Sequence, residues 1–246
     1  MRLILTNDDG IDAPGLAALV EAARGLGDLR LIAPDGPQSG CGHAVTTHQP
    51  VKLARRTDGG IAVAGTPADC VRLGLHHLAE GSDWVLSGIN AGGNLGADVF
   101  HSGTVAAARE AVLHGTPAIA ISHYLARRRS VDWDLAATRT AKVLRLLLAR
   151  PWLPGTFWNI NLPHPEPGGP EPKIVFCSLD TSPLPLAFRL EGDQAYYAGD
   201  YQSRVRRPGE DIDVCFGGAI AVSRISLGWQ PDQSQNPLAE PGSDAS

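Results

Sequence analysis

Three absences narrow the classes of protein to which this sequence can belong. No stretch approaches the roughly 20 consecutive apolar residues of a transmembrane helix. The first apolar run, Leu3 to Leu5, is short, and two aspartates follow it at positions 8 and 9. We therefore expect neither a membrane span nor a signal peptide. Basic residues are not in excess, because 21 Lys and Arg stand against 26 Asp and Glu, for a formal net charge of −5. Nucleic-acid duplexes and anionic membranes bind clustered cations, so neither is an expected partner.

Several familiar catalytic and cofactor motifs are also missing. The four cysteines are scattered without a CxxC pair or zinc-type histidine spacing, which indicates reduced thiols in a cytoplasmic protein. The sequence contains no P-loop of the form GxxxxGK(S/T), and no GxGxxG follows the first expected strand. A GxSxG nucleophile elbow is absent too. The adjacent Asp8 and Asp9 lack the Asp-x-Asp spacing of phosphatases that form an aspartyl phosphate.

Strand-like and helix-like segments alternate over the first two thirds of the chain. We expect strands at 2–6, 29–33, 83–87, 117–122 and 157–162, short strands at 45–55 and 61–64, and helices at 14–23, 66–78, 102–113 and 131–149. Strands that alternate with helices at this spacing form right-handed βαβ units. The sequence therefore predicts an α/β fold with a mostly parallel sheet and helices on both faces.

The pattern changes after a proline- and glycine-rich stretch at 163–172. The helical spacing stops there, and short strands, including a hairpin, are expected at 174–177, 195–199 and 219–227. The end of the chain is polar. We thus divide the chain into a Rossmann-like core at 1–163, a β-rich extension at 164–229 and a mobile polar tail at 230–246.

Polar side chains directly follow three of the expected strands. Asp8 and Asp9 come after the first strand, Ser39 lies in the loop after the second, and Asn90 and Asn94 follow the third. In parallel α/β sheets the carboxyl ends of the strands lie at one edge, and ligands bind there near the topological switch point. These side chains are therefore predicted to gather at one edge of the sheet.

An all-oxygen set of this kind predicts a site for a divalent cation. Two adjacent carboxylates repel each other, and one tends to gain a proton unless a positive charge lies opposite. Mg²⁺ and Mn²⁺ prefer carboxylate, hydroxyl and amide oxygens, which Asp8, Asp9, Ser39 and Asn90 would supply. A single Asp-Asp pair after a strand is more often a solvated turn or a helix cap. The coincidence at three strand ends favours the metal site.

The start of the helix expected at 102–113 is a candidate phosphate site. Ser102, Gly103 and Thr104 would offer hydroxyl groups, unpaired backbone N–H groups and the positive end of the helix dipole. An ordinary Ser or Thr helix cap explains the same residues equally well in isolation. The position just downstream of Asn90 and Asn94 favours phosphate binding.

These motifs, taken in order, resemble the SurE survival protein family. The resemblance rests on NDDG at 7–10, APG at 13–15, APDGPQSG at 33–40, GTPADCV at 65–71, SGINAGGNLGADVFHSGTVAAAREA at 87–111 and NINLP at 159–163. Members of this family are metal-dependent nucleotidases that act as phosphatases on nucleoside monophosphates. The sequence departs from the family in its last third, where Ser226-Leu227-Gly228 replaces a Thr-Pro-Leu segment.

The resemblance implies one divalent metal ion per subunit, Mg²⁺ or Mn²⁺, and it places both metal and phosphate on residues of this sequence. Its metal ligands fall on Asp8, Asp9, Ser39 and Asn90, and its phosphate contacts on Asn94, Ser102, Gly103 and Thr104. It also implies a Rossmann-like fold whose C-terminal β extension is exchanged in a homodimer, in some members within a homotetramer. The implied substrates are 5′- and 3′-mononucleotides and, for some members, short polyphosphate.

The resulting hypothesis is a metal-dependent nucleotidase in which an activated water attacks phosphorus without a covalent intermediate. Asp8 and Asp9 are the candidate catalytic residues, and His101 is a candidate donor of a proton to the leaving oxygen. One alternative is a nucleotide- or phosphate-binding protein without turnover. Another is a metal-dependent hydrolase of a different phosphoester, which would share the site and differ only in substrate.

Overall fold

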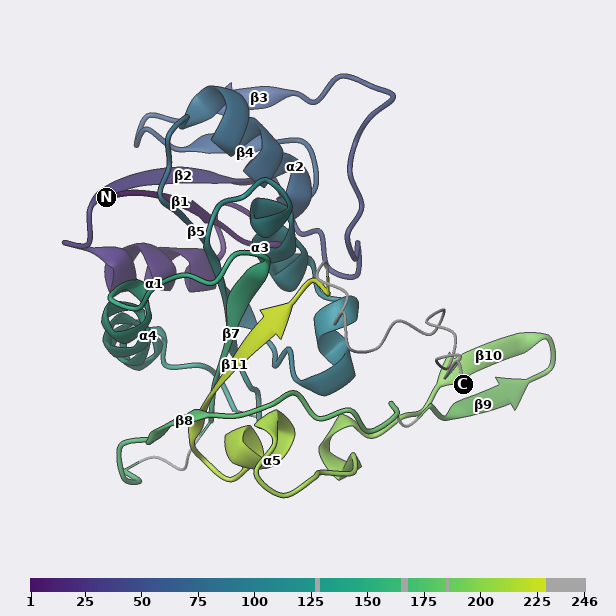
Figure 1. The fold of residues 1–246 in the computed structure, drawn as a ribbon. Coiled ribbons are helices and arrows are strands. Elements are labelled where there is room, and N and C mark those ends of the chain that lie inside the picture. Colours follow the sequence, from purple (N-terminus) through teal and green to yellow (C-terminus); the bar gives the residue numbers. More distant parts are fainter. Residues whose placement is uncertain (127–128, 165–167, 185, 229–246) are drawn as a thin grey trace, which may run out of the picture.

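The computed structural model describes residues 1–126, 129–164, 168–184 and 186–228, and a nine-stranded sheet forms its centre (Figure 1). The strand order is β3-β4-β2-β1-β5-β6-β7-β11-β8. The six strands from β4 to β7 run parallel, whereas β3 and β11 pair antiparallel with β4 and β7. These strands are β1 (Arg2–Thr6), β2 (Asp28–Pro34), β3 (Leu53–Arg55), β4 (Ile61–Val63), β5 (Trp84–Ala91), β6 (Ala118–His123), β7 (Thr156–Leu162), β8 (Ile174–Phe176) and β11 (Ile220–Ser226). The predicted mostly parallel sheet is confirmed.

Helices cover both faces of this sheet, as predicted. Helices α1 (Pro14–Ala23) and α4 (Trp133–Leu148) pack on one face, and α2 (Pro67–Leu73) and α3 (Gly103–Leu113) pack on the other (Figure 1). Helix α2 continues as a π-helical turn, η1 (Gly74–Leu78). Side chains of β1 alternate between the faces, because successive residues of a strand point to opposite sides. Leu3 and Leu5 join the α1 and α4 core, and Ile4 joins the α2 and α3 core.

The order of the strands places a switch point beside β1. The chain passes from β1 through α1 to β2 on one side, and it later returns to β5 on the other side of β1. Such a point leaves a crevice at the carboxyl ends of the two central strands. Helix α1 packs tightly against β5 here, since a Cβ atom on Gly15 would lie 1.9 Å from the carbonyl oxygen of Ile89.

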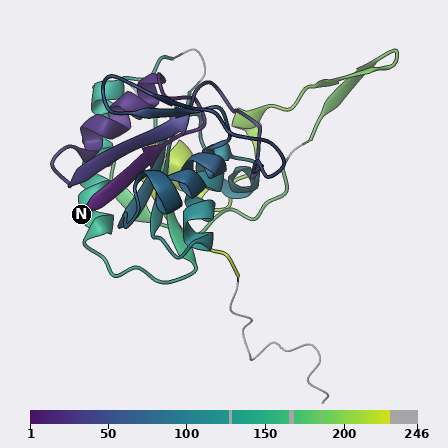
Figure 2. The same ribbon diagram turned by 90° about the horizontal axis from the view of Figure 1, so that it is seen from above.

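The last third of the chain contributes to two different sheets. Strands β8 and β11 extend the central sheet, while β9 (Phe188–Glu191) and β10 (Gln194–Tyr197) form a two-stranded antiparallel hairpin that projects from the body (Figures 1 and 2). The division at residue 163 remains a prediction, and the predicted tail at 230–246 lies outside the described residues.

The expectation that helices end before residue 163 is wrong. A short helix, α5 (Asp211–Phe216), lies beside β11, and a 3-10 turn, η3 (Tyr201–Ser203), precedes it. Six residues give too little periodicity to reveal α5, although Asp211 and Asp213 in its first turn suit a helix N-terminus.

Two further observations bear on the sequence-based expectations. Within the described ranges, none of the helices has the length and apolar character needed to cross a bilayer. The four cysteines are all free thiols, and Cys70 and Cys215 are buried.

Candidate active site

The loops after β1, β2 and β5 and the start of α3 together line a pocket of about 320 Å³ at the carboxyl edge of the sheet. Seven of the eight predicted site residues line it: Asp8, Asp9, Ser39, Asn90, Asn94, Ser102 and Gly103. Gly40, Ala91, Asp98 and His101 complete the lining. The pocket thus brings together residues from three strand ends and one helix start that are up to 95 positions apart in the sequence, while their roles as ligands stay predictions.

A tight turn after β1 presents the two aspartates. The buried Asn7 side chain closes this turn, since its Nδ2 donates to the Gly10 carbonyl at 2.9 Å and its Oδ1 accepts from the Gly10 N–H at 3.2 Å. Gly10 has a φ of +102°, a conformation that residues with a Cβ rarely adopt. A Cβ there would also lie 3.1 Å from the carbonyl carbon of Gly36. Asp8 and Asp9 are therefore held by local geometry that requires Asn and Gly beside them.

Asp8 is buried against the start of α3. The Thr104 hydroxyl donates to Asp8 Oδ1, and a Cβ on Gly103 would lie 2.8 Å from the Asp8 Cβ. Burial raises the pKa of Asp8 to about 6; the bond from Thr104 opposes this rise, and the charge of Asp9 adds to it. Thr104 is fully buried and is not among the residues that line the pocket, so its predicted contact with phosphate remains a prediction.

Asp9 lines the pocket and is partly buried. Its Oδ2 accepts a bond of 3.4 Å from the Ala91 N–H, and burial raises the pKa of its carboxyl group. No lysine or arginine is found among the described residues that line this pocket. Burial disfavours the charge on both carboxylates, and a bound cation would offset that cost.

The donor set fits a hard divalent cation. Over the described part of the chain, no group of three or more His, Cys, Asp or Glu side chains is placed to hold a metal ion. A cation in this pocket would therefore combine the carboxylates of Asp8 and Asp9 with the neutral oxygens of Ser39 and Asn90. Oxygen-only ligands of this kind suit Mg²⁺ or Mn²⁺ better than Zn²⁺.

Backbone and side-chain contacts position Ser39 and Asn90, the two candidate ligands that carry no charge. The Gln38 N–H donates to the Asp8 carbonyl at 2.7 Å and so ties the Ser39 loop to the end of β1. Asn90 Nδ2 donates to the Gly92 carbonyl at 2.9 Å, so the amide oxygen is the atom of this side chain that could face a cation. The exposed Ser39 hydroxyl belongs to the loop after β2, whereas Asn90 lies near the end of β5, which is longer than the strand predicted at 83–87.

A charged network behind the pocket anchors the Ser39 loop to α3. His43, four residues after Ser39, lies with its Nε2 2.6 Å from Oε2 of the buried Glu110. Burial acts to raise the pKa of Glu110, but hydrogen bonds from His43, Arg72 and His114 lower it to about 2. Glu110 is therefore an ionised anchor at neutral pH.

Asn94 is held by a polar cluster that the sequence analysis left without a role. Its N–H donates to Asn161 Oδ1 at 2.8 Å, and its carbonyl accepts from Asn159 Nδ2 and Asn161 Nδ2, each at 2.9 Å. Its Nδ2 donates to Ser122 Oγ at 2.7 Å. Two buried asparagines at alternate positions of the apolar strand β7 were the signal that could have revealed this support.

The segment before α3 is held from the last third of the chain. Asp98, on the 3-10 turn η2 (Gly96–Phe100), accepts from Arg204 Nη1 at 2.6 Å and from the Tyr201 hydroxyl at 3.0 Å. The N–H of Gly96 donates to Asp211 Oδ2 at 2.8 Å. These partners lie over 100 residues away, and no local sequence pattern could have identified them.

The start of α3 faces the same pocket. Ser102 is its N-cap, and Ser102 Oγ accepts from the Val105 N–H at 3.1 Å. The helix begins at the buried Gly103, so its unpaired N–H groups and positive dipole end lie beside the two aspartates. Ser102 is thus an ordinary cap, and phosphate binding by this helix start remains a prediction.

The fold and the site together define the class of this protein. It is a doubly wound α/β protein whose acidic, oxygen-lined pocket lies at the switch point of the sheet, beside the N-terminus of a helix. The family model described as "Survival protein SurE" matches residues 3–181. The chain belongs to the SurE family.

Relatives and a solved structure agree with this assignment. A protein from Nostoc sp. is 54% identical over 227 residues, which are 92% of this chain and 100% of the relative. The protein named 5′-nucleotidase SurE of Methylobacterium radiotolerans is 39% identical over 235 residues, covering 92% of this chain and 91% of its own. The crystal structure of the SurE protein from Aquifex aeolicus superposes with a TM-score of 0.85 at 28% identity, over 97% of this chain and 98% of that chain.

Proposed function

We propose that this protein is a 5′-nucleotidase that hydrolyses nucleoside 5′-monophosphates and uses one divalent cation, Mg²⁺ or Mn²⁺, per subunit. The observation that carries the proposal is the pocket in which Asp8, Asp9, Ser39 and Asn90 meet the start of α3. The family membership supports it, and so does the name 5′-nucleotidase SurE of the relative from Methylobacterium radiotolerans.

The pocket residues divide into cation ligands and phosphate ligands. A cation bound by Asp8, Asp9, Ser39 and Asn90 would supply Lewis-acid polarisation of a phosphoryl oxygen. Asn94 Nδ2, the Ser102 hydroxyl and the first N–H groups of α3 would hold the non-bridging oxygens, where negative charge develops.

Proton transfer falls to the remaining polar groups of the pocket. Asp9 is less buried than Asp8 and, in this proposal, orients the attacking water and accepts its proton. His101 is exposed at the rim of the pocket and would donate a proton to the leaving nucleoside oxygen. The open rim also suits 3′-mononucleotides and short polyphosphate, which we include as proposed substrates.

We also propose a homodimer in which the β9–β10 hairpin packs on a second copy, alone or within a tetramer. The hairpin stands away from the body (Figure 2), and its apolar side chains Phe188 and Leu190 are 59% and 75% exposed. Exposed apolar side chains of this kind mark interaction sites. Replacing both by serine should convert the protein to a monomer in light scattering, and an unchanged mass would refute the arrangement.

Phosphate release from a substrate panel tests the proposed activity. Purified protein is assayed with AMP, GMP, 3′-AMP and p-nitrophenyl phosphate, first after EDTA treatment and then after addition of Mn²⁺. EDTA should abolish release and Mn²⁺ should restore it, and Asp8→Asn should reduce release to background. Asp28→Asn is the matched control, because Asp28 is an exposed carboxylate at the amino end of β2, at the opposite edge of the sheet.

The same assay separates the proposal from its alternatives. Nucleotide binding without metal-dependent release would identify a binding protein that lacks turnover. Release from p-nitrophenyl phosphate but from no nucleotide would identify a hydrolase of a different phosphoester. Release that persists in Asp8→Asn at saturating Mn²⁺ would contradict the assigned ligand set.

A further inference from the structure

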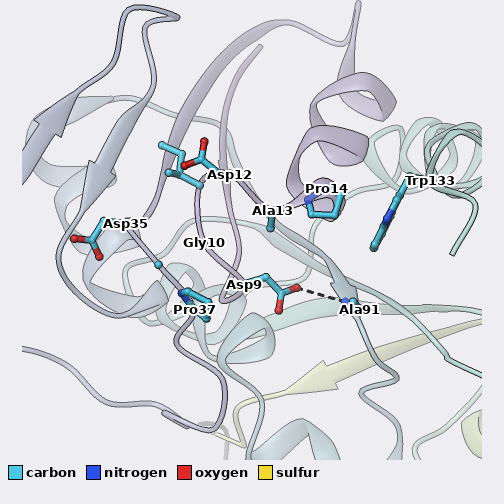
Figure 3. A pocket seen from close by; sticks show the side chains of 12 residues that line it. Asp9, Gly10, Asp12, Ala13, Pro14, Asp35, Pro37, Ala91 and Trp133 are labelled. Atoms are coloured by element: carbon cyan, nitrogen blue, oxygen red, sulfur yellow. Dashed lines mark hydrogen bonds between the residues drawn. The ribbon is translucent and has the colours of Figure 1, made fainter. Parts of the chain in front are cut away.

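A second pocket, of about 420 Å³, adjoins the candidate active site (Figure 3). Asp9 and Ala91 line both pockets, so the two share a wall. The rest of its lining comes from the turns after β1 and β2 and from Trp133, the first residue of α4. In Figure 3, Trp133 lies beside Pro14 at one end of the pocket, and Asp35 lies at the other.

We propose that this second pocket binds the nucleoside part of the substrate, with the base against the Trp133 indole and a sugar hydroxyl or an amino group donating to Asp35. The inference rests on the proposed function, because a phosphomonoester held in the active site would extend its organic group over Asp9 and Ala91. The volume lies within the roughly 300–1,000 Å³ typical of small-molecule pockets.

The lining selects for a neutral, flat ligand that carries hydrogen-bond donors. The turn after β1 contributes the apolar residues Ile11 and Ala13, and α1 contributes Pro14. The described lining residues include three aspartates and no lysine, arginine or histidine. A phosphate or carboxylate group would be repelled there. A nucleoside meets the requirement, since it is uncharged, has an aromatic face and offers hydroxyl and amino donors.

Trp133 is fixed in a position from which it can stack on a base. Its side chain is partly buried, and a Cβ on Gly15 would lie 3.1 Å from its Cη2 atom. The outer edge of the indole therefore rests on the small residue near the start of α1, and Trp133 lines the pocket beside it. Aromatic stacking is tolerant of base identity, so it suits a protein that accepts several nucleotides.

Asp35 is the carboxylate best placed to accept from the ligand. Asp12 already pairs with Arg56, whose Nη1 lies 2.8 Å from Asp12 Oδ1. Asp9 accepts from the Ala91 N–H and belongs to the active site. Asp35 is exposed, and within the described residues its carboxylate has no hydrogen bond or ion pair.

Steady-state kinetics of Trp133 variants with two substrates test this subsite. Trp133→Leu keeps an apolar side chain and removes the aromatic face, and ribose 5-phosphate has the sugar phosphate of AMP without the base. Because stacking of one base is worth about 1–3 kcal/mol, Trp133→Leu should raise the KM for AMP about 5- to 150-fold. The kcat and KM for ribose 5-phosphate should change by less than about twofold, because this substrate lacks the base that Trp133 is proposed to contact.

Two further variants serve as controls. Trp133→Phe restores an aromatic face and should restore most of the affinity for AMP. Trp158→Leu alters another partly buried tryptophan, which packs on Phe176 and lines neither pocket, and it should leave the kinetics of both substrates unchanged. Equal losses for AMP and ribose 5-phosphate in Trp133→Leu, or an unchanged KM for AMP, would overturn the subsite.

A measurement of adenosine binding tests the nucleoside subsite independently of the proposed nucleotidase activity. Titration of adenosine into EDTA-treated wild-type protein and Trp133→Leu requires no turnover. Binding by the wild type that is weakened in Trp133→Leu supports the subsite even if neither substrate is hydrolysed, in which case the proposed function alone fails. Absence of adenosine binding by the wild type would overturn the subsite whatever the protein hydrolyses.

Discussion

The hydrogen bond from Thr104 to Asp8 yields a quantitative prediction about metal affinity. Thr104 is fully buried, and its hydroxyl donates to the carboxylate that we assign as a metal ligand. Thr104→Val preserves the shape of the side chain and removes the donor. A hydrogen bond to a charged group contributes about 1.5–3 kcal/mol. At 1.36 kcal/mol per pKa unit, its loss should raise the pKa of Asp8 by about 1–2 units.

The sign of the effect follows from the form that the bond stabilises. The donor favours the ionised carboxylate, so its removal moves the pKa of Asp8 upward from its present value of about 6. Divalent cations bind the ionised form. At pH 6 the Kd for Mn²⁺ should therefore rise about 5- to 50-fold in Thr104→Val, and by about pH 8.5 most of this difference should disappear.

Calorimetric titration of Mn²⁺ across this pH range is the assay. Thr104→Ser retains the hydroxyl and should keep the wild-type pH dependence, with a somewhat lower stability from the lost methyl group. Two results would refute the reasoning: superimposable pH profiles for wild type and Thr104→Val, or a loss of affinity of the same size at every pH. The second result would mean that Thr104 positions α3 without tuning the charge of Asp8.

Two further predictions concern the same site. Since burial raises the pKa of Asp8 in the folded protein above its usual value of 3.8, the Asp8 carboxyl group should contribute a loss of stability to the metal-free protein as pH rises from about 4 to 6. Asp8→Asn should therefore increase the free energy of unfolding of EDTA-treated protein at pH 8 by an amount on the order of 3 kcal/mol. The same substitution should have little effect near pH 4. Urea unfolding that shows no gain in stability at pH 8 would contradict this prediction. Asn161→Leu removes the side chain that forms hydrogen bonds with both the N–H and the carbonyl of Asn94. The substitution should lower the free energy of unfolding by about 1–3 kcal/mol. It should also raise the KM for AMP, while the affinity for Mn²⁺ is retained. A variant with an unchanged KM would show that Asn94 needs no support from β7.

The sequence was most informative where local pattern and sheet geometry act together. Alternating strands and helices dictate a parallel sheet, and in such a sheet the residues that follow β1, β2 and β5 must meet at one edge. For this reason Asp8, Ser39 and Asn90 could be placed at one edge from their positions after the expected strands, although β5 in the structure extends beyond Asn90.

Features that depend on distant parts of the chain could not be predicted in this way. The pairing of Asp98 with Tyr201 and Arg204 requires the path of the last third of the chain, and α5 is too short to show a helical period. Trp133 belongs to a helix that is remote in sequence from the turns beside it, and a single tryptophan forms no motif.

Thr104 shows why the role of a single side chain can be ambiguous in the sequence. A hydroxyl at a helix start suits both a phosphate ligand and a buried hydrogen bond, and the sequence does not distinguish these roles. The absence of a side chain at Gly103 lets α3 approach Asp8 and brings the Thr104 hydroxyl to the carboxylate, which the sequence pattern did not reveal.

A crystal structure of the protein grown with Mn²⁺ tests the central claim most directly. Anomalous scattering would locate the ion independently of any assumption about its ligands. The account predicts one peak per chain, within about 2.0–2.6 Å of carboxylate oxygens of Asp8 and Asp9, the Ser39 hydroxyl and the Asn90 amide oxygen. A peak at another cluster, such as the one formed by Glu110 and His43, or no peak at these four residues at saturating Mn²⁺, would contradict it.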